Sequence, residues 1–123
     1  MGLIFHRLRT ATKAVGAKLV IDVTPAAGAV QISVRKWNAD LLVCSGYKWL
    51  GGHGGIAFAI FSDALLSTVP LLAGLVERTP LDTNAKQLLL SKSAARSISL
   101  TLSYISALGF NAALDELLNL GVE

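Results

Sequence analysis

Lys48 and Asp22 are the two residues whose type and position in the chain favour chemistry. Lys48 lies in a glycine-rich stretch, Gly46 to Gly55, that directly follows a run of apolar residues typical of a buried strand. A lysine amine that is partly shielded from water loses its proton more readily and can attack a carbonyl carbon. For Lys48 taken alone, an ordinary surface lysine remains the alternative.

Asp22 closes another apolar run, which begins at Lys18. A carboxylate at the end of a buried strand is costly unless a cation or a hydrogen-bond donor accompanies it. A protonated ring nitrogen of a bound cofactor would be such a partner. An ordinary turn or helix-capping aspartate explains the same position, so both interpretations stay open.

The elements that must position these residues follow from periodicity and from chain-breaking residues. Trp37 is the expected apolar anchor of a short turn or helix between the first two strands. The pattern predicts helices over residues 5–15, from 62–63 towards 69, and over 104–120, the last ended by Gly121. In the first of these helices, Leu8, Ala11, Ala14 and Val15 lie on one side. Strands are predicted over residues 18–24, 39–44 and 56–61, and a loop within 75–92.

A strand, a short crossover and a second strand form a βαβ unit, which predicts an α/β fold with a mostly parallel sheet. The first strand is apolar on both faces, so we expect it to be buried. Ligand-binding residues collect at the carboxyl ends of such strands, where Asp22 and Ser45 stand.

Composition narrows the functional classes. The 123 residues fit one domain, and 53% are apolar while only 15% are charged, which indicates a hidden interface. The net charge of +3 is modest and aromatic residues do not interleave with the basic ones, so nucleic-acid binding is not favoured. Asp63 and Pro70 interrupt the longest apolar stretch, residues 54–76, so no membrane span is predicted.

The single cysteine, Cys44, cannot form an internal disulfide, which favours a reducing compartment and hence the cytoplasm. No signal-peptide core follows the amino terminus. Cys44 ends a predicted buried strand and is interpreted as a core thiol. His6 and His53 lack metal-ligand spacing to a second ligand, so no metal site is predicted.

Three segments in order resemble the class V aminotransferase family of fold-type-I pyridoxal-phosphate enzymes, which includes kynureninases, cysteine desulfurases and isopenicillin-N-epimerase-like proteins. The segments are Val-Ile-Asp22-Val-Thr-Pro-Ala-Ala-Gly28, then Asn-Ala-Asp40-Leu-Leu-Val-Cys-Ser45-Gly-Tyr-Lys48-Trp-Leu, then Gly54-Gly-Ile-Ala-Phe. The resemblance is clearest over about residues 16–66. It implies the three-layer αβα large domain of these enzymes, with residues 1–123 forming part of it.

The resemblance also implies a cofactor, pyridoxal 5'-phosphate, and a role for each matching residue. Lys48 would hold the cofactor as an imine, and Asp22 would pair with its pyridine nitrogen. Ser45 and Tyr47 would hydrogen-bond its phosphate, although core packing is an equal alternative for Tyr47. Family members are dimers in which the partner chain adds a phosphate ligand, and Thr101 or Ser99 stands in the corresponding region.

The chain departs from the family pattern at two positions and in length. Pro25 stands where many relatives carry Gln or His for the cofactor's ring oxygen, and it has no side-chain donor. Tyr47 precedes the lysine where desulfurases carry His, as in kynureninase-like relatives, which disfavours desulfuration. The first half of the large domain and the small C-terminal domain have no counterpart here. Cys44 does not correspond to the desulfurase nucleophile, which lies on a later loop.

The sequence therefore predicts part of a pyridoxal-phosphate enzyme that acts on an amino-acid substrate through a lysine imine, as a homodimer or larger assembly. The alternative is a non-catalytic remnant or interaction module that keeps the fold signature without turnover.

Overall fold

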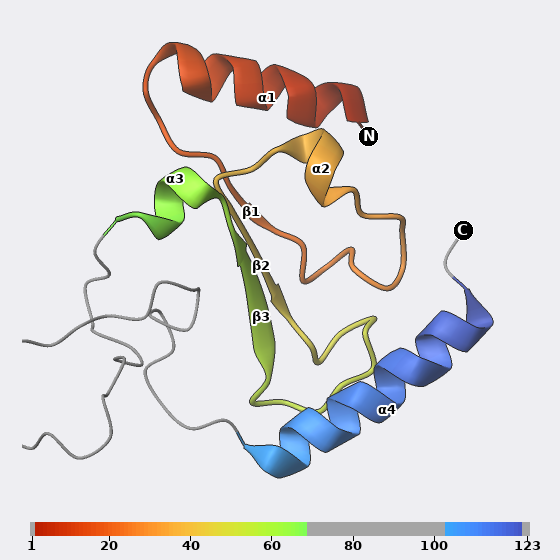
Figure 1. The fold of residues 1–123 in the computed structure, drawn as a ribbon. Helices are drawn as coiled ribbons and strands as arrows, with labels where there is room; N and C mark the ends of the chain where they lie inside the picture. The colour runs from red at the N-terminus through yellow and green to blue at the C-terminus, as the bar shows by residue number, and fades with distance from the viewer. Residues whose placement is uncertain (1, 69–102, 122–123) are drawn as a thin grey trace, which may run out of the picture. The chain divides into compact units, whose positions relative to one another are not determined.

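The computed structural model describes residues 2–68 and 103–121 of the chain (Figure 1). The chain divides into two compact units, Met1–Leu65 with Leu102–Glu123, and Leu66–Thr101, and the account below concerns the first. In chain order the elements are α1 (Gly2–Ala14), β1 (Val20–Asp22), α2 (Val34–Trp37), β2 (Leu41–Ser45), β3 (Ala57–Phe61), α3 (Asp63–Leu66), whose last residue falls in the second unit, and α4 (Tyr104–Leu120).

The three strands form one sheet in the order β1-β2-β3, which confirms the α/β fold class. β1 and β2 are parallel, with Ile21 beside Leu42, as a βαβ unit requires. β2 and β3 are antiparallel, with Cys44 opposite Phe58. The connection between these two strands contains no crossover helix, so the chain returns in the opposite direction and the sheet is mixed.

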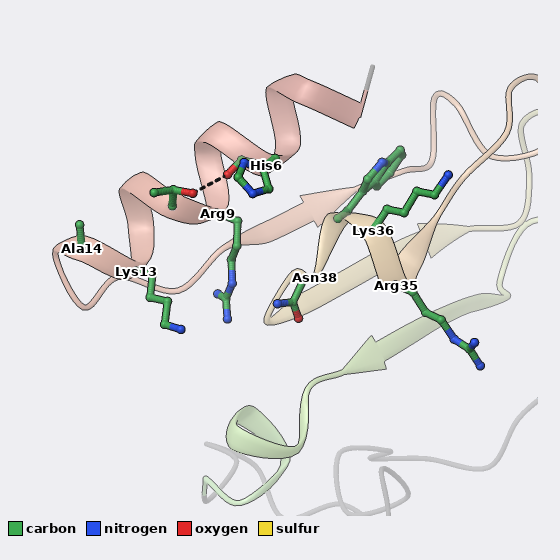
Figure 2. A pocket seen from close by; sticks show the side chains of 9 residues that line it. His6, Arg9, Lys13, Ala14, Arg35, Lys36 and Asn38 are labelled. Carbon is green, nitrogen blue, oxygen red and sulfur yellow. Dashed lines mark hydrogen bonds between the residues drawn. The ribbon is translucent and has the colours of Figure 1, made fainter.

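A polar contact and an aromatic contact hold helix α1 beside α2 and the residue that precedes β2. The Arg9 guanidinium pairs with the buried Asp40 carboxylate, which also accepts the Leu19 N–H at 2.9 Å (Arg9 is drawn in Figure 2). Phe5 stacks on Trp37 with ring centroids 4.1 Å apart. The predicted apolar side of this helix does not pack in the core, since Leu8 and Val15 are exposed. The helix ends near Gly16, as expected.

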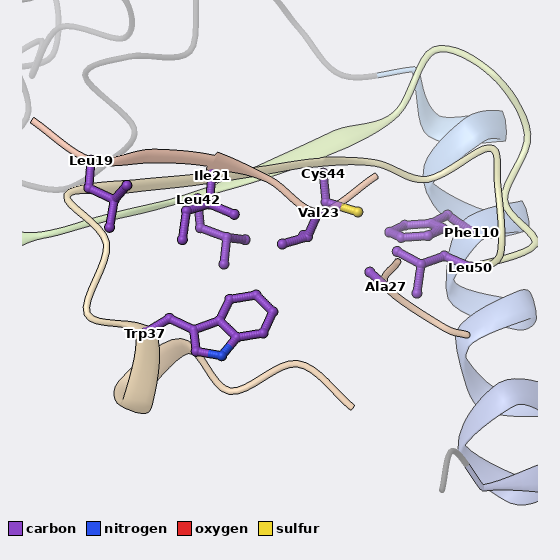
Figure 3. Close-up of a cluster of buried hydrophobic side chains, with 9 residues drawn as sticks. All are labelled: Leu19, Ile21, Val23, Ala27, Trp37, Leu42, Cys44, Leu50 and Phe110. Atoms are coloured by element: carbon purple, nitrogen blue, oxygen red, sulfur yellow. The ribbon is translucent and has the colours of Figure 1, made fainter. Parts of the chain in front are cut away.

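One face of the sheet carries the hydrophobic core. Trp37 rises from α2 towards the sheet, and Phe110 reaches Leu50 from α4 (Figure 3). Trp37 is only 4% exposed, which confirms it as the apolar anchor of its segment. The remaining core residues are Leu19, Ile21, Val23, Ala27, Leu42 and Cys44.

The opposite face of the sheet is open among the described residues. In β1 the residues alternate, with Ile21 buried between exposed Val20 and Asp22. The expectation that β1 is buried on both faces was therefore wrong. Val20 is 56% exposed, because no described element packs over it. Apolar sequence on both sides of a strand predicts burial only when both covering layers are present.

The predicted bounds of the other helices and strands agree with the structure only in part. Helix α4 has the predicted bounds, and Gly121 follows it with a positive φ of 78°. The Ser103 hydroxyl accepts the Ser106 N–H at its start. The three strands are each shorter at their starts than predicted, and α3 ends at Leu66 rather than near residue 69. The predicted loop within 75–92 lies outside the described residues, and no helix of the described part is long and apolar enough to cross a membrane.

Candidate functional site

Asp22 is the last residue of β1, and its side chain lies on the open face of the sheet. The Asp22 Oδ1 atom accepts the backbone N–H of Thr24 at 2.8 Å. An aspartate that accepts the N–H two residues ahead forms a local turn, and this turn fixes the carboxylate at the carboxyl end of the strand. The expected hydrogen-bond donor is therefore supplied by the chain itself.

Thr24 joins the carboxyl ends of the two parallel strands. Its side chain is buried, and its Oγ1 atom accepts the backbone N–H of Ser45 at 2.9 Å. The sequence reasoning gave Thr24 no role. The signal that would have found it is the Asp-x-Thr spacing, in which a short polar side chain bonds nearby backbone.

The Asp22 carboxyl is held in its ionised form. The Thr24 hydroxyl and the Thr24 backbone N–H, in that order, lower the pKa of Asp22, and partial burial opposes them. The positive charge of Lys48 makes the smallest contribution to this lowering. Asp22 therefore offers a negative charge at neutral pH.

A hollow of about 280 Å³ opens at this end of the sheet. Its walls come from the ends of β1 and β2 and from the start of β3, and its lining residues are Asp22, Thr24, Val43, Cys44, Ser45, Ala57, Phe58 and Ala59. The volume lies just below the usual range for small-molecule pockets, which begins at about 300 Å³. The structure thus brings Asp22 and Ser45 together at one hollow, as expected from their strand positions.

Lys48 and Tyr47 lie beyond the hollow, on the glycine-rich connection to β3. Both side chains are exposed, with Tyr47 56% exposed, so Tyr47 is not packed in the core. The expected shielding of Lys48 from water is absent among the described residues. The connection is nevertheless ordered by its own backbone, since the Gly52 N–H donates to the Gly46 carbonyl at 2.9 Å and Gly51 N–H to Lys48 O at 2.9 Å.

Helix α4 supports this connection from a distant part of the chain. Phe110 packs so closely that a Cβ atom at Gly52 would lie 2.5 Å from its ring. The Ser106 hydroxyl donates to the Gly54 carbonyl at 3.2 Å.

The segment after β1 also passes close to the lysine loop. At Gly28, φ is +92° and a Cβ atom would lie 2.6 Å from the Trp49 carbonyl oxygen. Glycine is thus required where the segment after β1 passes the lysine loop.

Cys44 is 1% exposed and lies among core residues, as predicted for a core thiol. Burial raises the pKa of Cys44, and the negative charge of Asp22 raises it further. The thiolate is the nucleophilic form of cysteine, so these two effects disfavour nucleophilic chemistry at Cys44. Thr101 and Ser99, the expected phosphate ligands from a partner chain, lie outside the described residues.

Comparison with known proteins gives three findings. A family model described as Aminotransferase class-V matches residues 4–123. No curated protein sequence matches the chain. Among 45 matching chains of solved structures is an apo cysteine desulfurase from Thermococcus onnurineus NA1, with 28% sequence identity and a TM-score of 0.71.

The match to this desulfurase covers 89% of the present chain but only 27% of the desulfurase chain. The described strands, the lysine connection and α4 therefore correspond to a limited portion of a much longer protein.

Proposed function

The chain belongs to the aminotransferase class-V family, and from that premise we propose that it forms the cofactor-lysine part of a pyridoxal-phosphate-dependent enzyme acting on an amino-acid substrate. The observation that carries the proposal is the Asp22 carboxylate, which the Thr24 N–H fixes at a hollow formed by the ends of β1 and β2 and the start of β3. The position of Lys48 in a glycine-rich segment would not by itself favour a cofactor-binding lysine over a lysine on an ordinary surface loop.

The donor set fits this cofactor. An ionised carboxylate stabilises a protonated pyridine nitrogen, and a hydroxyl donor suits a phosphate dianion. Asp22 supplies the first and Ser45 the second, and both line the hollow. We assign the covalent attachment point to Lys48, whose exposed amine is accessible to an aldehyde, and further phosphate contacts to Tyr47 and to Thr101 of a partner chain. Bound pyridoxal phosphate would supply the electron sink for reactions at the α-carbon.

Each of the site residues named above then has a defined role. Asp22 remains ionised and orients the ring, and Thr24 holds Asp22 in place. In turnover, the Lys48 Nζ atom takes and returns the substrate's α-proton as a general base. Pro25 offers no donor to the ring oxygen, so that contact must come from elsewhere or be absent. Water exclusion also has to come from elsewhere, because Lys48 is exposed here.

Reductive trapping tests the proposal on the full 123-residue chain. Pyridoxal phosphate is added at equimolar concentration, borohydride fixes any lysine adduct, and peptide mass spectrometry locates it. We expect the adduct to concentrate at Lys48 and to vanish in Lys48→Ala. Lys18→Ala is the matched control, since Lys18 is also exposed and stands near the start of β1; it should leave the adduct unchanged. Asp22→Ala should lower the Lys48 adduct several-fold at unchanged protein concentration.

The alternative is a non-catalytic remnant or interaction module, and it is favoured by one observation: the Lys48 side chain is exposed and not shielded from water among the described residues. Under this alternative the adduct spreads over exposed lysines without preference for Lys48. The same trapping experiment therefore decides between the two functions.

We also propose a homodimer or larger assembly. Large apolar side chains are exposed along α4, namely Tyr104, Ile105, Leu108, Leu118 and Leu120, each at least 73% exposed. A helix that exposes this much apolar surface is typical of an interaction site. Sedimentation of the wild type and of Ile105→Ser/Leu108→Ser checks this, and a monomeric wild type would contradict it.

A further inference from the structure

We infer that the hollow between α1 and α2 binds a small polyanion that carries two or more phosphate groups, at a site separate from Asp22 and Lys48. This hollow has a volume of about 540 Å³, within the usual range for small-molecule sites. Its lining residues are His6, Arg9, Thr10, Lys13, Ala14, Arg35, Lys36, Trp37 and Asn38. The inference is independent of the proposed cofactor function.

The lining carries four permanent positive charges and no carboxylate. Arg9 and Lys13 project from α1 in a similar direction, on the side where Asn38 lies, whereas the head groups of Arg35 and Lys36 extend from α2 in two different directions, away from α1 (Figure 2). These side chains come from two segments more than twenty residues apart in the sequence. The fold, and not a local run of basic residues, therefore creates this charge cluster.

Most of this charge has no counter-charge within the described residues. Arg9 pairs with Asp40, and Asp40 is also approached by Lys18 at 3.8 Å. In residues 2–68 and 103–121, no ion pair engages Lys13, Arg35 or Lys36. Like charges gathered around a concave surface concentrate a positive potential there, which attracts an anion.

The neutral residues and the size of the hollow indicate the kind of anion. Thr10 and Asn38 add uncharged hydrogen-bonding groups to the lining, and the Arg9 Nε atom is buried without a hydrogen-bond partner. Arginine and lysine together are well suited to phosphate oxygens. The positively charged residues belong to two helices, and the volume of the hollow exceeds that of a single phosphate. A ligand with several phosphate groups matches both the spread of the charges and the volume.

A nucleic acid fits this hollow less well. Single-stranded nucleic acids are held by exposed aromatic rings on which bases stack. Trp37 is the one Trp, Tyr or Phe of the lining, and it is 4% exposed and already stacked on Phe5. The hollow therefore offers charge without an exposed Trp, Tyr or Phe ring, which favours a compact anion over a base that stacks.

Calorimetric titration of the full chain with inorganic tripolyphosphate at low salt tests the site. We expect saturable binding that weakens about five- to tenfold in Lys13→Gln and, separately, in Lys36→Gln, since each removes a charge-assisted contact. Arg7→Gln is the matched control, because Arg7 is on the same helix and is exposed, lies outside the lining, and its loss changes the net charge equally. It should change the affinity less than twofold.

Three outcomes would overturn the inference. They are no saturable binding of tripolyphosphate to the wild type, an equal loss of affinity in Arg7→Gln and Lys13→Gln, and displacement of tripolyphosphate by a single-stranded oligonucleotide that binds more tightly than tripolyphosphate. All three variants replace exposed side chains, so their folding can be verified by circular dichroism before titration. Neither Lys48 nor Asp22 is altered, so the result does not depend on cofactor binding.

Discussion

The two faces of the β1-β2-β3 sheet differ in what covers them within the described residues. On one face Ile21, Leu42 and Cys44 are buried beneath Trp37 and the segment after β1. On the other face Val20 is 56% exposed, and Asp22 stands at the edge of a hollow. Side chains on the first face stabilise the fold by burial, whereas on the second face a charged group is accessible to a ligand or to further polypeptide. Neighbouring residues of one short strand therefore have different roles.

The largest test of this comparison removes the anchor of the covered face. Trp37→Ala deletes a side chain that is 4% exposed and that packs both on the core and on Phe5. We expect the free energy of unfolding to fall by about 3–5 kcal/mol, from lost burial and the cavity left behind. Urea denaturation of the full chain measures the change. Trp49→Ala is the matched control, because Trp49 is 63% exposed and its loss should cost about 0.5 kcal/mol or less.

A sharper test uses two adjacent residues of β1 that belong to opposite faces. Ile21→Ala should lower the free energy of unfolding by about 2–4 kcal/mol, because Ile21 is 8% exposed among core side chains. Val20→Ala should change it by about 0.5 kcal/mol or less. Equal losses from the two substitutions, measured by the same denaturation, would mean that the open face is covered in solution.

Sequence alone predicted the features that depend on local pattern. The α/β class, the anchor Trp37, the bounds of α4 and the placement of Asp22 and Ser45 at strand ends all follow from periodicity and strand order. The apolar composition predicted a hidden interface but not that the second face of β1 would be exposed, because an apolar strand carries no record of whether its covering layer is present. The contacts that hold α1, Arg9 with Asp40 and Phe5 with Trp37, were not predicted either, because they join residues far apart in the sequence.

The Arg9–Asp40 pair gives the covered side of the molecule a dependence on pH. The pKa of Asp40 is lowered, and the hydrogen bond from the Leu19 N–H is the largest cause. The Arg9 guanidinium lowers this pKa further, whereas burial raises it. The unfolded chain therefore binds a proton at Asp40 at higher pH than the native chain does. The resulting stability is present above about pH 4, the ordinary range for aspartate, and is lost as the pH falls through the lower native value.

Asp40→Asn tests this effect, since it keeps an oxygen for the Leu19 N–H but removes the charge. We expect it to lower the free energy of unfolding by about 1–3 kcal/mol at pH 7. The difference from the wild type should shrink between about pH 5 and pH 2, as the wild-type carboxylate is protonated. Thermal or urea unfolding at several pH values measures both. A difference that is constant with pH would contradict the assignment of charge to this site.

The smallest effect concerns Asp22 on the open face and requires a site-specific measurement. The Thr24 hydroxyl is the largest cause of the lowered pKa of Asp22, so Thr24→Val should raise the midpoint of the Asp22 titration while the carboxyl stays exposed. Carbon-detected NMR of the side-chain carboxyl follows this titration. Thr12→Val is the matched control, because the Thr12 hydroxyl donates to the Arg9 carbonyl and makes no contact with Asp22. If both variants leave the midpoint unchanged, the Thr24 hydroxyl does not stabilise the ionised Asp22 carboxylate, and only the Thr24 N–H is left to hold it.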